Sequence, residues 1–173
     1  KSVVAIQLTA RLTAKQKMVQ YVSKNSAPRD VYASKLSGIR SKSWVNNLFK
    51  GSGTYINAER NQYDALLVDE AHRLNEKSGM FSNLGENQIK EIINAARCSV
   101  FFLDEDQRVT MKDIGSDAEI AMWAAHAGAT LHRLELTSQF RCNGSDGYMA
   151  YLDQLLGIRK TANTNLSDLN YDF

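Results

Sequence analysis

The chain has few of the residues and segments that mark secreted or membrane-spanning proteins. Its 173 residues include only two cysteines, Cys98 and Cys142. These cysteines lack the spacing of metal ligands, and two lone thiols are typical of a reducing cytosol rather than of a disulfide scaffold. No apolar run is long enough to cross a bilayer, and the amphipathic segment 3–12 is not followed by the small-residue cleavage site of a signal peptide. These absences predict a cytoplasmic protein that does not enter a membrane.

Acidic residues are scarce in the first third of the chain. Residues 1–62 carry 11 Lys and Arg against two acidic residues, whereas residues 63–173 carry 10 Lys and Arg against 17 Asp and Glu. A basic segment beside an acidic one is typical of a polyanion-binding face next to a metal–phosphate site. A solvated basic surface without a partner explains the charge equally well. The length and the 43 % hydrophobic content suit one domain with a sizeable core.

Glycine is absent where a phosphate-binding loop would need it. The chain opens on Lys1-Ser2, and apolar residues follow at roughly helical spacing. A Lys-Ser pair that opens a helix is what remains of the motif GxxxxGKS when its glycines and the preceding strand are missing. The chain also starts without Met and ends on a polar, asparagine-rich tail at 161–173. We therefore expect a fragment of a longer protein.

Two apolar runs that end in carboxylates carry the clearest pattern. Run 65–68 ends in Asp69 and Glu70, and run 99–103 ends in Asp104. A helical segment lies between them, so we expect a βαβ unit whose strands end side by side. In nucleotide hydrolases an Asp at such a strand end holds Mg²⁺ and a following Glu orients the attacking water. The alternative interpretation is a buried strand that ends in a charged loop.

The remaining segments complete an α/β pattern. Further strands are predicted at 18–22, 54–56 and 131–136, and helices at 3–12, 29–36, 44–49, 86–96, 116–127 and 145–156. Ser116 and Glu119 form a capping box at the start of helix 116–127, and Gly128 ends that helix. We expect an α/β fold with a mostly parallel sheet flanked by helices.

Two polar segments follow predicted strands and are candidates for binding. Segment 23–29 carries small polar and basic side chains that suit a sugar–phosphate backbone. An ordinary loop, with Pro28 near the start of the next helix, fits that segment equally well. Arg141 follows strand 131–136 and either pairs with a carboxylate or stabilises phosphate charge in a transition state. The three histidines are scattered, so no Ser/His/Asp triad is indicated.

Taken together, these segments resemble the first motor domain of superfamily 1 helicases, and in particular the Schlafen group 3-like DNA/RNA helicase family. The resemblance is carried by Lys1-Ser2, YVSKNSAPRDVYASKL at 21–36, YDALLVDEAHRLNEKSG at 63–79, VFFLDEDQRV at 100–109 and LTSQFRCNGSDGYMAYLDQLLG at 136–157. DEAH alone is widespread, but DEAHRL followed by LDEDQ and then SQFRC is not. The resemblance implies a RecA-like P-loop NTPase core that lacks the first strand and most of the phosphate loop. Residues 1–157 would be a partial motor domain and 158–173 a linker toward a second one.

The resemblance also implies roles around a bound nucleotide. Lys1 and Ser2 match the end of the Walker A motif, so they would contact the β/γ-phosphates and Mg²⁺. Asp69 matches the Walker B ligand of Mg²⁺. Glu70 matches the residue that positions or activates the hydrolytic water.

Further roles follow from the same resemblance. Gln107 matches the motif III glutamine that senses the γ-phosphate, and Asp104 precedes it in that motif. Arg141 matches the arginine that contacts the γ-phosphate from the far side. Three residues at the position of the strand-binding motif would contact DNA or RNA: Lys24, Asn25 and Arg29.

The resemblance implies that the parent protein hydrolyses ATP with Mg²⁺ in a nucleic-acid-dependent way. A helicase needs two motor domains, so we expect the fragment itself to be inactive. One alternative is a regulatory P-loop ATPase that binds no nucleic acid. A second is a non-catalytic module that binds nucleic acid through its basic surface. The sequence does not distinguish DNA from RNA, and it identifies no partner protein.

Overall fold

The sheet at the centre of the chain is built from parallel strands. The structure, a computed structural model, describes residues 1–36, 38–79, 81–108 and 110–136. The chain divides into two units, Lys1–His132 and Arg133–Phe173, and the elements described below belong to the first. Within the described residues the strand order is β2–β1–β3–β4, and every neighbouring pair is parallel. The strands are β1 (Val19–Ser23), β2 (Phe49–Lys50), β3 (Ala65–Asp69) and β4 (Ser99–Phe101).

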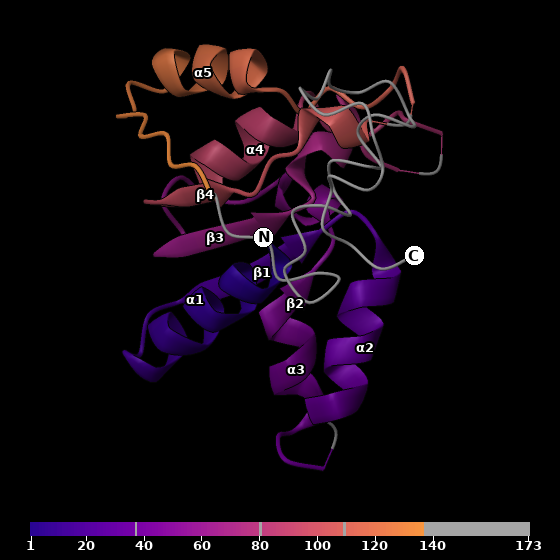
Figure 1. Cartoon of the computed structure of the whole chain (residues 1–173), viewed down its shortest axis with the longest axis vertical. Helices are drawn as coiled ribbons and strands as arrows, with labels where there is room; N and C mark the ends of the chain where they lie inside the picture. The colour runs from indigo at the N-terminus through magenta and orange to yellow at the C-terminus, as the bar shows by residue number, and fades with distance from the viewer. Residues whose placement is uncertain (37, 80, 109, 137–173) are drawn as a thin grey trace, which may run out of the picture. The chain divides into compact units, whose positions relative to one another are not determined.

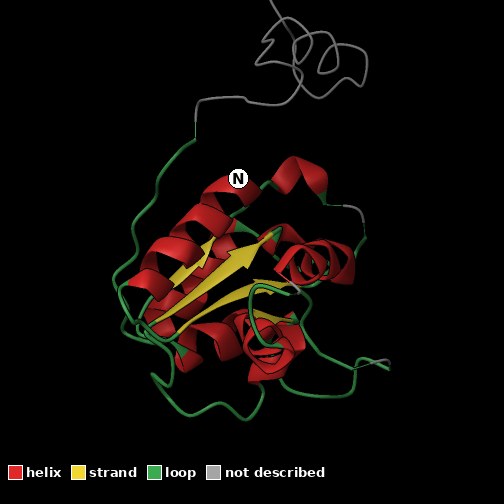
Figure 2. Ribbon diagram, turned by 90° about the horizontal axis from the view of Figure 1, so that it is seen from below, coloured by secondary structure: helices red, strands yellow, loops and turns green. Residues whose placement is uncertain are grey.

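Helices surround this sheet (Figure 1 and Figure 2). They are α1 (Ser2–Ala14), α2 (Ser26–Leu36), α3 (Lys42–Leu48), α4 (Gln88–Ala95) and α5 (Asp117–His126), with 3-10 turns η1 (Ser52–Tyr55), η2 (Ala71–Arg73) and η3 (Glu105–Gln107). α2 begins three residues earlier than predicted, because the first turn of a helix tolerates the missing N–H of Pro28. The predicted α/β class with a parallel sheet is confirmed, and the arrangement is consistent with a RecA-like core.

The two central strands are buried along their whole length. Every residue of β1 and of β3 is buried, as expected for parallel strands covered on both faces. Their register pairs Val19 with Ala65 and Ser23 with Asp69. Full burial of an aliphatic side chain such as Leu67 contributes about 1.5–3 kcal/mol to stability. The two strands therefore end side by side.

The two faces of the sheet are covered by different helices. α1 packs on the face that presents Tyr21 and Leu67. α4 and α5 contribute to the core on the face that presents Leu66, and Figure 1 shows the two layers on either side of the strands. Successive side chains of a strand point to opposite faces. Asp69 therefore shares the face of Leu67 and lies on the α1 side of the sheet.

Two predicted strands are wrong. Residues 54–56 do not form a strand, because the Thr54 N–H and hydroxyl both bond to the Gly51 carbonyl (3.2 and 2.8 Å) and close the 3-10 turn η1. Residues 131–136 alternate in polarity but form no strand in the structure. A strand requires ladder bonds to a neighbour, and alternation alone does not supply one.

The helix ends confirm part of the predicted capping. The Ser116 hydroxyl accepts a bond from the Glu119 N–H at 3.1 Å, as predicted for an N-cap. The Glu119 carboxylate accepts from the Asn87 amide at 3.0 Å and from the Trp123 indole at 2.9 Å. α5 ends before Gly128, whose φ of 66° is the left-handed conformation typical of this position. The Glu119 side chain thus joins α5 to the start of α4.

Candidate functional site

The carboxyl ends of β1 and β3 form the point where the chain changes direction across the sheet. From β1 the chain proceeds to β2 on one side, and from β3 it proceeds to β4 on the other. Open α/β sheets bind ligands at such a point, beyond the carboxyl ends of the strands. Ser23 ends β1 there and is followed by Lys24 and Asn25, whereas Asp69 ends β3 and is followed by Glu70. The structure thus brings the predicted Asp–Glu pair next to residues 23–29, the segment predicted to bind a nucleic-acid strand and hereafter called the strand-binding segment.

Asp69 is a buried carboxylate held by two donors. Asp69 is only 3 % exposed. One oxygen accepts a bond from the Tyr21 hydroxyl at 2.6 Å, and the other accepts from the Glu70 N–H at 3.1 Å. Burial raises the pKa of Tyr21, and its bond to Asp69 raises this pKa further. The hydroxyl therefore remains a donor throughout the neutral pH range and fixes the orientation of Asp69.

Tyr21 was not among the residues predicted for the site. A period of two places Tyr21 and Ser23 on the same face of β1, and the register then places Ser23 beside Asp69. The Ser23 hydroxyl is buried and has no hydrogen-bond partner within the described residues. The sequence therefore shows that this face of β1 ends in polar residues. It does not show that this end of β1 lies beside Asp69 of β3.

Glu70 sits in an unusual backbone conformation. Its φ of 51° and ψ of 46° are left-handed, a region that costs a non-glycine residue on the order of 1 kcal/mol. The next residue, Ala71, donates its N–H to the Phe102 carbonyl at 3.0 Å, which ties the turn to the segment after β4. The Glu70 carboxylate accepts a bond from the Asn25 side-chain amide at 2.6 Å. The direction of this carboxylate is thus set by both strands.

Three of the residues assigned to the nucleotide phosphates come together at the start of α1. The Lys1 ammonium lies 2.8 Å from an Asp104 oxygen, and the Gln107 amide donates to the same oxygen at 3.0 Å. Ser2 is the first residue of α1. The Lys1 and Asp104 side chains are 39 % and 29 % exposed, so their ion pair contributes little to stability. Its importance is that it places these polar groups at one edge of the sheet.

Asp113 is the buried centre of a cluster that the sequence did not reveal. Its side chain is fully buried, and it pairs with the Lys24 ammonium at 3.2 Å and with the Arg73 guanidinium at 3.3 Å. It also accepts from the Thr110 N–H at 3.0 Å, while Lys24 donates to Asn75 at 2.9 Å. We call these five residues the Asp113 cluster. Lys24, predicted to contact nucleic acid, is therefore held in a structural ion pair, and its nucleic-acid contact stays a prediction.

Arg29 lies beside the other end of the strand-binding segment. Its Nε donates to the Asn25 carbonyl at 3.2 Å. An added Cβ on Gly51, just after β2, would lie 3.4 Å from its guanidinium. The Arg29 side chain therefore extends along the carboxyl edge of the sheet from α2 toward β2.

Several predictions fall outside the described residues. Arg141, helix 145–156 and the proposed boundary between 157 and 158 all lie there. They remain predictions. Cys142, predicted to be a lone thiol, also lies outside the described residues. The other cysteine, Cys98, is a free and exposed thiol.

His72 is the one histidine that is buried near the Asp–Glu pair. It is 3 % exposed, and its Nδ1 has no hydrogen-bond partner within the described part of the chain. Burial lowers its pKa, although the charges of Glu70 and Asp104 oppose this effect. The neutral imidazole therefore predominates at neutral pH. No motif in the sequence singles out this histidine.

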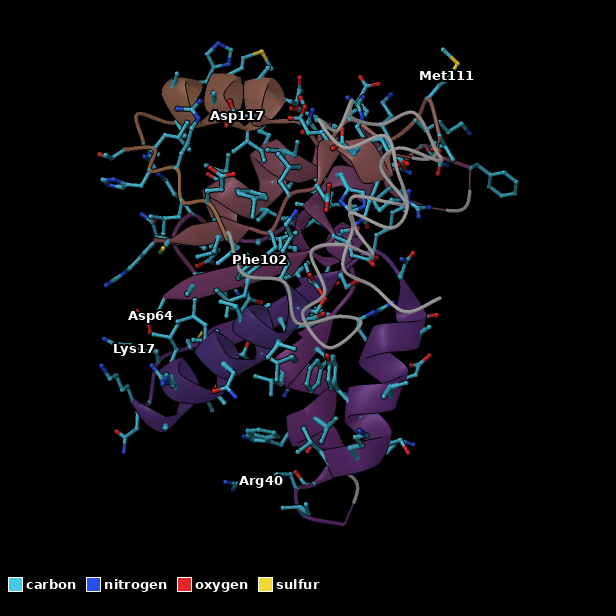
Figure 3. All side chains as sticks on the ribbon, in the orientation of Figure 1. Lys17, Arg40, Asp64, Phe102, Met111 and Asp117 are labelled. Carbon is cyan, nitrogen blue, oxygen red and sulfur yellow. The ribbon has the colours of Figure 1, made fainter. Side chains whose placement is uncertain are left out.

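Two cavities among the described residues lie away from this edge. A cavity of about 410 Å³ is lined by residues that include Lys17, Met18, Trp44 and Tyr63. Lys17 and Asp64 lie on the same side of the molecule in Figure 3, and they mark the amino edge of the sheet. A second cavity, of about 290 Å³, is lined by residues that include Tyr55 and Glu91. None of the predicted site residues lines either cavity.

The described residues lack two features that would change this picture. No group of three or more His, Cys, Asp or Glu side chains there is arranged to hold a metal ion. No described helix has both the length and the apolar character that crossing a membrane requires.

The fold and this edge define an α/β protein with a parallel sheet and an Asp–Glu pair where its central strands end. The chain belongs to the Schlafen group 3 DNA/RNA helicase domain family, whose model matches residues 1–173. The resemblance found in the sequence is thereby confirmed. No curated protein and no solved structure matches the chain.

Proposed function

We propose that the chain is part of a nucleic-acid-dependent ATPase of helicase type. The observation that carries the proposal is the position of Asp69 and Glu70. Asp69 is the last residue of β3 and Glu70 follows it, at the point where the chain changes direction across the sheet, and Asp69 lies on the face covered by α1. The amino end of α1, with Lys1 and Ser2, lies at the same edge. A helix amino terminus beside a carboxylate pair suits a phosphate group with its metal ion.

The residues present fit Mg²⁺. Each carboxylate oxygen of Asp69 has one donor assigned to it, and such an oxygen can accept two. The buried Ser23 hydroxyl stands in register with Asp69 and has no protein partner within the described residues. Carboxylate, hydroxyl and water oxygens are the ligands that Mg²⁺ prefers. Bound Mg²⁺ would neutralise charge on the phosphates of ATP.

The chain's own groups would position the reactants. Asp69, fixed by Tyr21, would hold the metal side of the nucleotide, and Lys1 with Ser2 would contact its β- and γ-phosphates. Glu70 would orient the water that attacks the γ-phosphate. Gln107 would sense that phosphate from η3, and Arg141 would contact it from the far side. Catalysis of this kind rests on positioning and charge stabilisation.

Glu70→Gln in the full-length protein tests the proposal. The change keeps the size of the side chain and removes its charge, so we expect kcat for ATP to fall about 100-fold or more. ATP affinity, measured by equilibrium binding, stays within about twofold because Glu70 acts on the water. Glu76→Gln, an exposed carboxylate in the same loop, is the matched control. Normal turnover in Glu70→Gln would remove the assignment.

A regulatory ATPase that binds no nucleic acid is the second candidate. The Asp113 cluster favours it, because Lys24 is engaged there and one predicted nucleic-acid contact is thereby occupied. The ATPase rate with and without single-stranded DNA and RNA separates the two candidates. Stimulation supports the helicase-type ATPase, and an unchanged rate supports the regulatory one.

A further inference from the structure

The strand-binding segment touches the proposed water-positioning residue directly. Asn25, two residues beyond β1, donates its side-chain amide to the Glu70 carboxylate at 2.6 Å. The two residues are 45 positions apart in the chain, and the parallel pairing of β1 with β3 brings them together. Hydrogen bonds to a carboxylate are roughly twice as strong as those between neutral groups. The bond therefore has the strength to restrain Glu70.

Further contacts restrain both Asn25 and Glu70, the two partners of this bond. On the Glu70 side, the left-handed backbone and the Ala71–Phe102 bond fix where the side chain starts. On the Asn25 side, the carbonyl accepts from Arg29 at 3.2 Å. The neighbouring Lys24 is anchored on the buried Asp113. The position of the Asn25 amide thus depends on two cationic side chains, and both are candidate contacts for a nucleic-acid backbone.

The bond limits what the Glu70 carboxylate can do. An ionised carboxylate only accepts hydrogen bonds, and it orients a water through the lone pairs of its oxygens. While Asn25 holds one oxygen, the direction of the carboxylate is set by the segment after β1. A phosphate group forms stronger, often bidentate, bonds with an arginine than a backbone carbonyl does. A phosphate would therefore draw Arg29 away from the Asn25 carbonyl and loosen the segment.

We propose that Asn25 is a positioning residue that restrains Glu70, and that nucleic acid releases this restraint by engaging Arg29. The proposal rests on the proposed ATPase function and adds the route by which nucleic acid regulates it. Asn25 then acts through Glu70. It is not itself a required contact of the nucleic acid.

The test compares Asn25→Ala and Asn25→Leu with the wild type in the full-length protein. ATP turnover is measured with Mg²⁺, without nucleic acid and with a saturating single-stranded oligonucleotide, as DNA and as RNA. Asn25→Leu keeps the approximate size of the side chain and removes the donor without adding a charge beside Glu70, so it guards against a folding defect in Asn25→Ala. Asn46→Ala, an exposed asparagine on α3, is the matched control.

We expect the rate without nucleic acid to rise about tenfold in both Asn25 variants, as loss of a bond to a charged group allows. Stimulation by the oligonucleotide falls toward onefold. The KM for ATP and the oligonucleotide affinity, measured by fluorescence anisotropy, stay within about twofold. Asn25→Gln, which keeps an amide, restores part of the stimulation. In a Glu70→Gln background the Asn25 substitutions have no effect, because they act through Glu70.

Other outcomes overturn the proposal. An unchanged rate and an unchanged stimulation show that the bond does not restrain Glu70. A fall in both rates shows that Asn25 supports the active orientation instead. Lost oligonucleotide affinity with a normal basal rate makes Asn25 a plain nucleic-acid contact. A wild-type protein that does not hydrolyse ATP removes the proposed function and this inference together, whereas an active enzyme indifferent to Asn25 removes this inference alone.

Discussion

Gly115 marks the closest approach of two backbone segments beside the proposed site. A Cβ added there would lie 1.9 Å from the Ala71 carbonyl oxygen and 2.7 Å from the His72 Cα. Neither backbone atom can move without shifting the turn that holds Glu70. This glycine is therefore required for space, and the sequence alone does not separate it from the other nine glycines.

Gly115→Ala is expected to lower the free energy of unfolding by about 1–3 kcal/mol or more, the cost of forcing a methyl group into an occupied space. Urea denaturation measures the change. Gly51→Ala is the control, because its nearest added contact is an ordinary 3.4 Å to the Arg29 side chain. Equal midpoints for the two variants would show that the segment around Gly115 relaxes freely.

Glu91 makes the folding stability of the chain depend on pH. Burial raises its pKa above the ordinary 4.5, despite N–H donors at Glu86 and Asn87, and one of its oxygens has no partner within the described residues. A carboxyl with a raised folded-state pKa adds stability below its unfolded pKa. That contribution is lost as the pH rises through the folded value. The charged form of Glu91 is therefore unfavourable at neutral pH.

We expect Glu91→Gln to be more stable than the wild type at pH 7, since the amide keeps an acceptor for the Glu86 N–H without a buried charge. The advantage should disappear below about pH 4, where the carboxyl is protonated in both states. Thermal denaturation from pH 3 to 8 measures this difference. The exposed Glu76→Gln shows no such trend if burial is the cause, and a constant difference at Glu91 would contradict the explanation.

At the scale of elements, Asn87 joins two helices. Its side-chain oxygen accepts from the N–H groups of Ile89 and Lys90 at 2.9 and 3.2 Å, which caps α4. Its amide nitrogen donates to Glu119 at the start of α5. One side chain therefore satisfies orphan donors of one helix and holds the beginning of the other.

Asn87→Ala is expected to cost about 1 kcal/mol for the lost cap, plus the lost bond to Glu119. Asn87→Asp keeps the cap but faces the Glu119 carboxylate, so its cost reports the connection between the helices. Asn87→Asp combined with Glu119→Gln should recover part of this cost in chemical denaturation. Additive effects of the two substitutions would show that the helices are not coupled through this contact.

The elements that the sequence predicts well are those with a local cause. β3 and β4 follow from apolar runs, and α5 from its cap and its terminal glycine. β2 was missed because it has two residues, Phe49 and Lys50, which is too short for any periodicity. The predicted strand at 131–136 failed for the opposite reason, because its alternation is clear but its partner is absent from the described sheet. Pairing is a property of two segments, and one segment cannot reveal it.

The same distinction applies to the site. Asp69 and Glu70 are neighbours in the sequence, so their position at a strand end could be predicted. The contacts that orient them, from Tyr21 and from Asn25, join residues 48 and 45 positions apart. Lys24 was assigned from its place in the segment that matches the strand-binding motif, and its partner Asp113 lies 89 positions away. Such pairs become visible only when the strand order is known.

At the scale of the whole molecule, the uneven charge predicts how nucleic acid should bind. The basic first third contacts the backbone if the proposed function is correct, so affinity for a single strand should fall steeply with salt. For about four contacted phosphates, raising the salt from about 50 to about 200 mM lowers affinity roughly 50-fold. Arg29→Ala should reduce the log–log slope by about 0.7, whereas the exposed Lys77→Ala should not. Fluorescence anisotropy over a salt series measures both, and salt-independent binding would exclude a backbone contact.

The Asp113 cluster also determines how the segments at this edge of the sheet unfold locally. One carboxylate serves a lysine that follows β1, an arginine that follows β3 and the N–H of Thr110. If one of these segments detaches, it leaves a buried charge without its counter-ion, which costs several kcal/mol. The three segments therefore gain little by opening separately. Their amide protons should exchange with solvent at a common rate, as one cooperative unit, although they come from three distant parts of the chain.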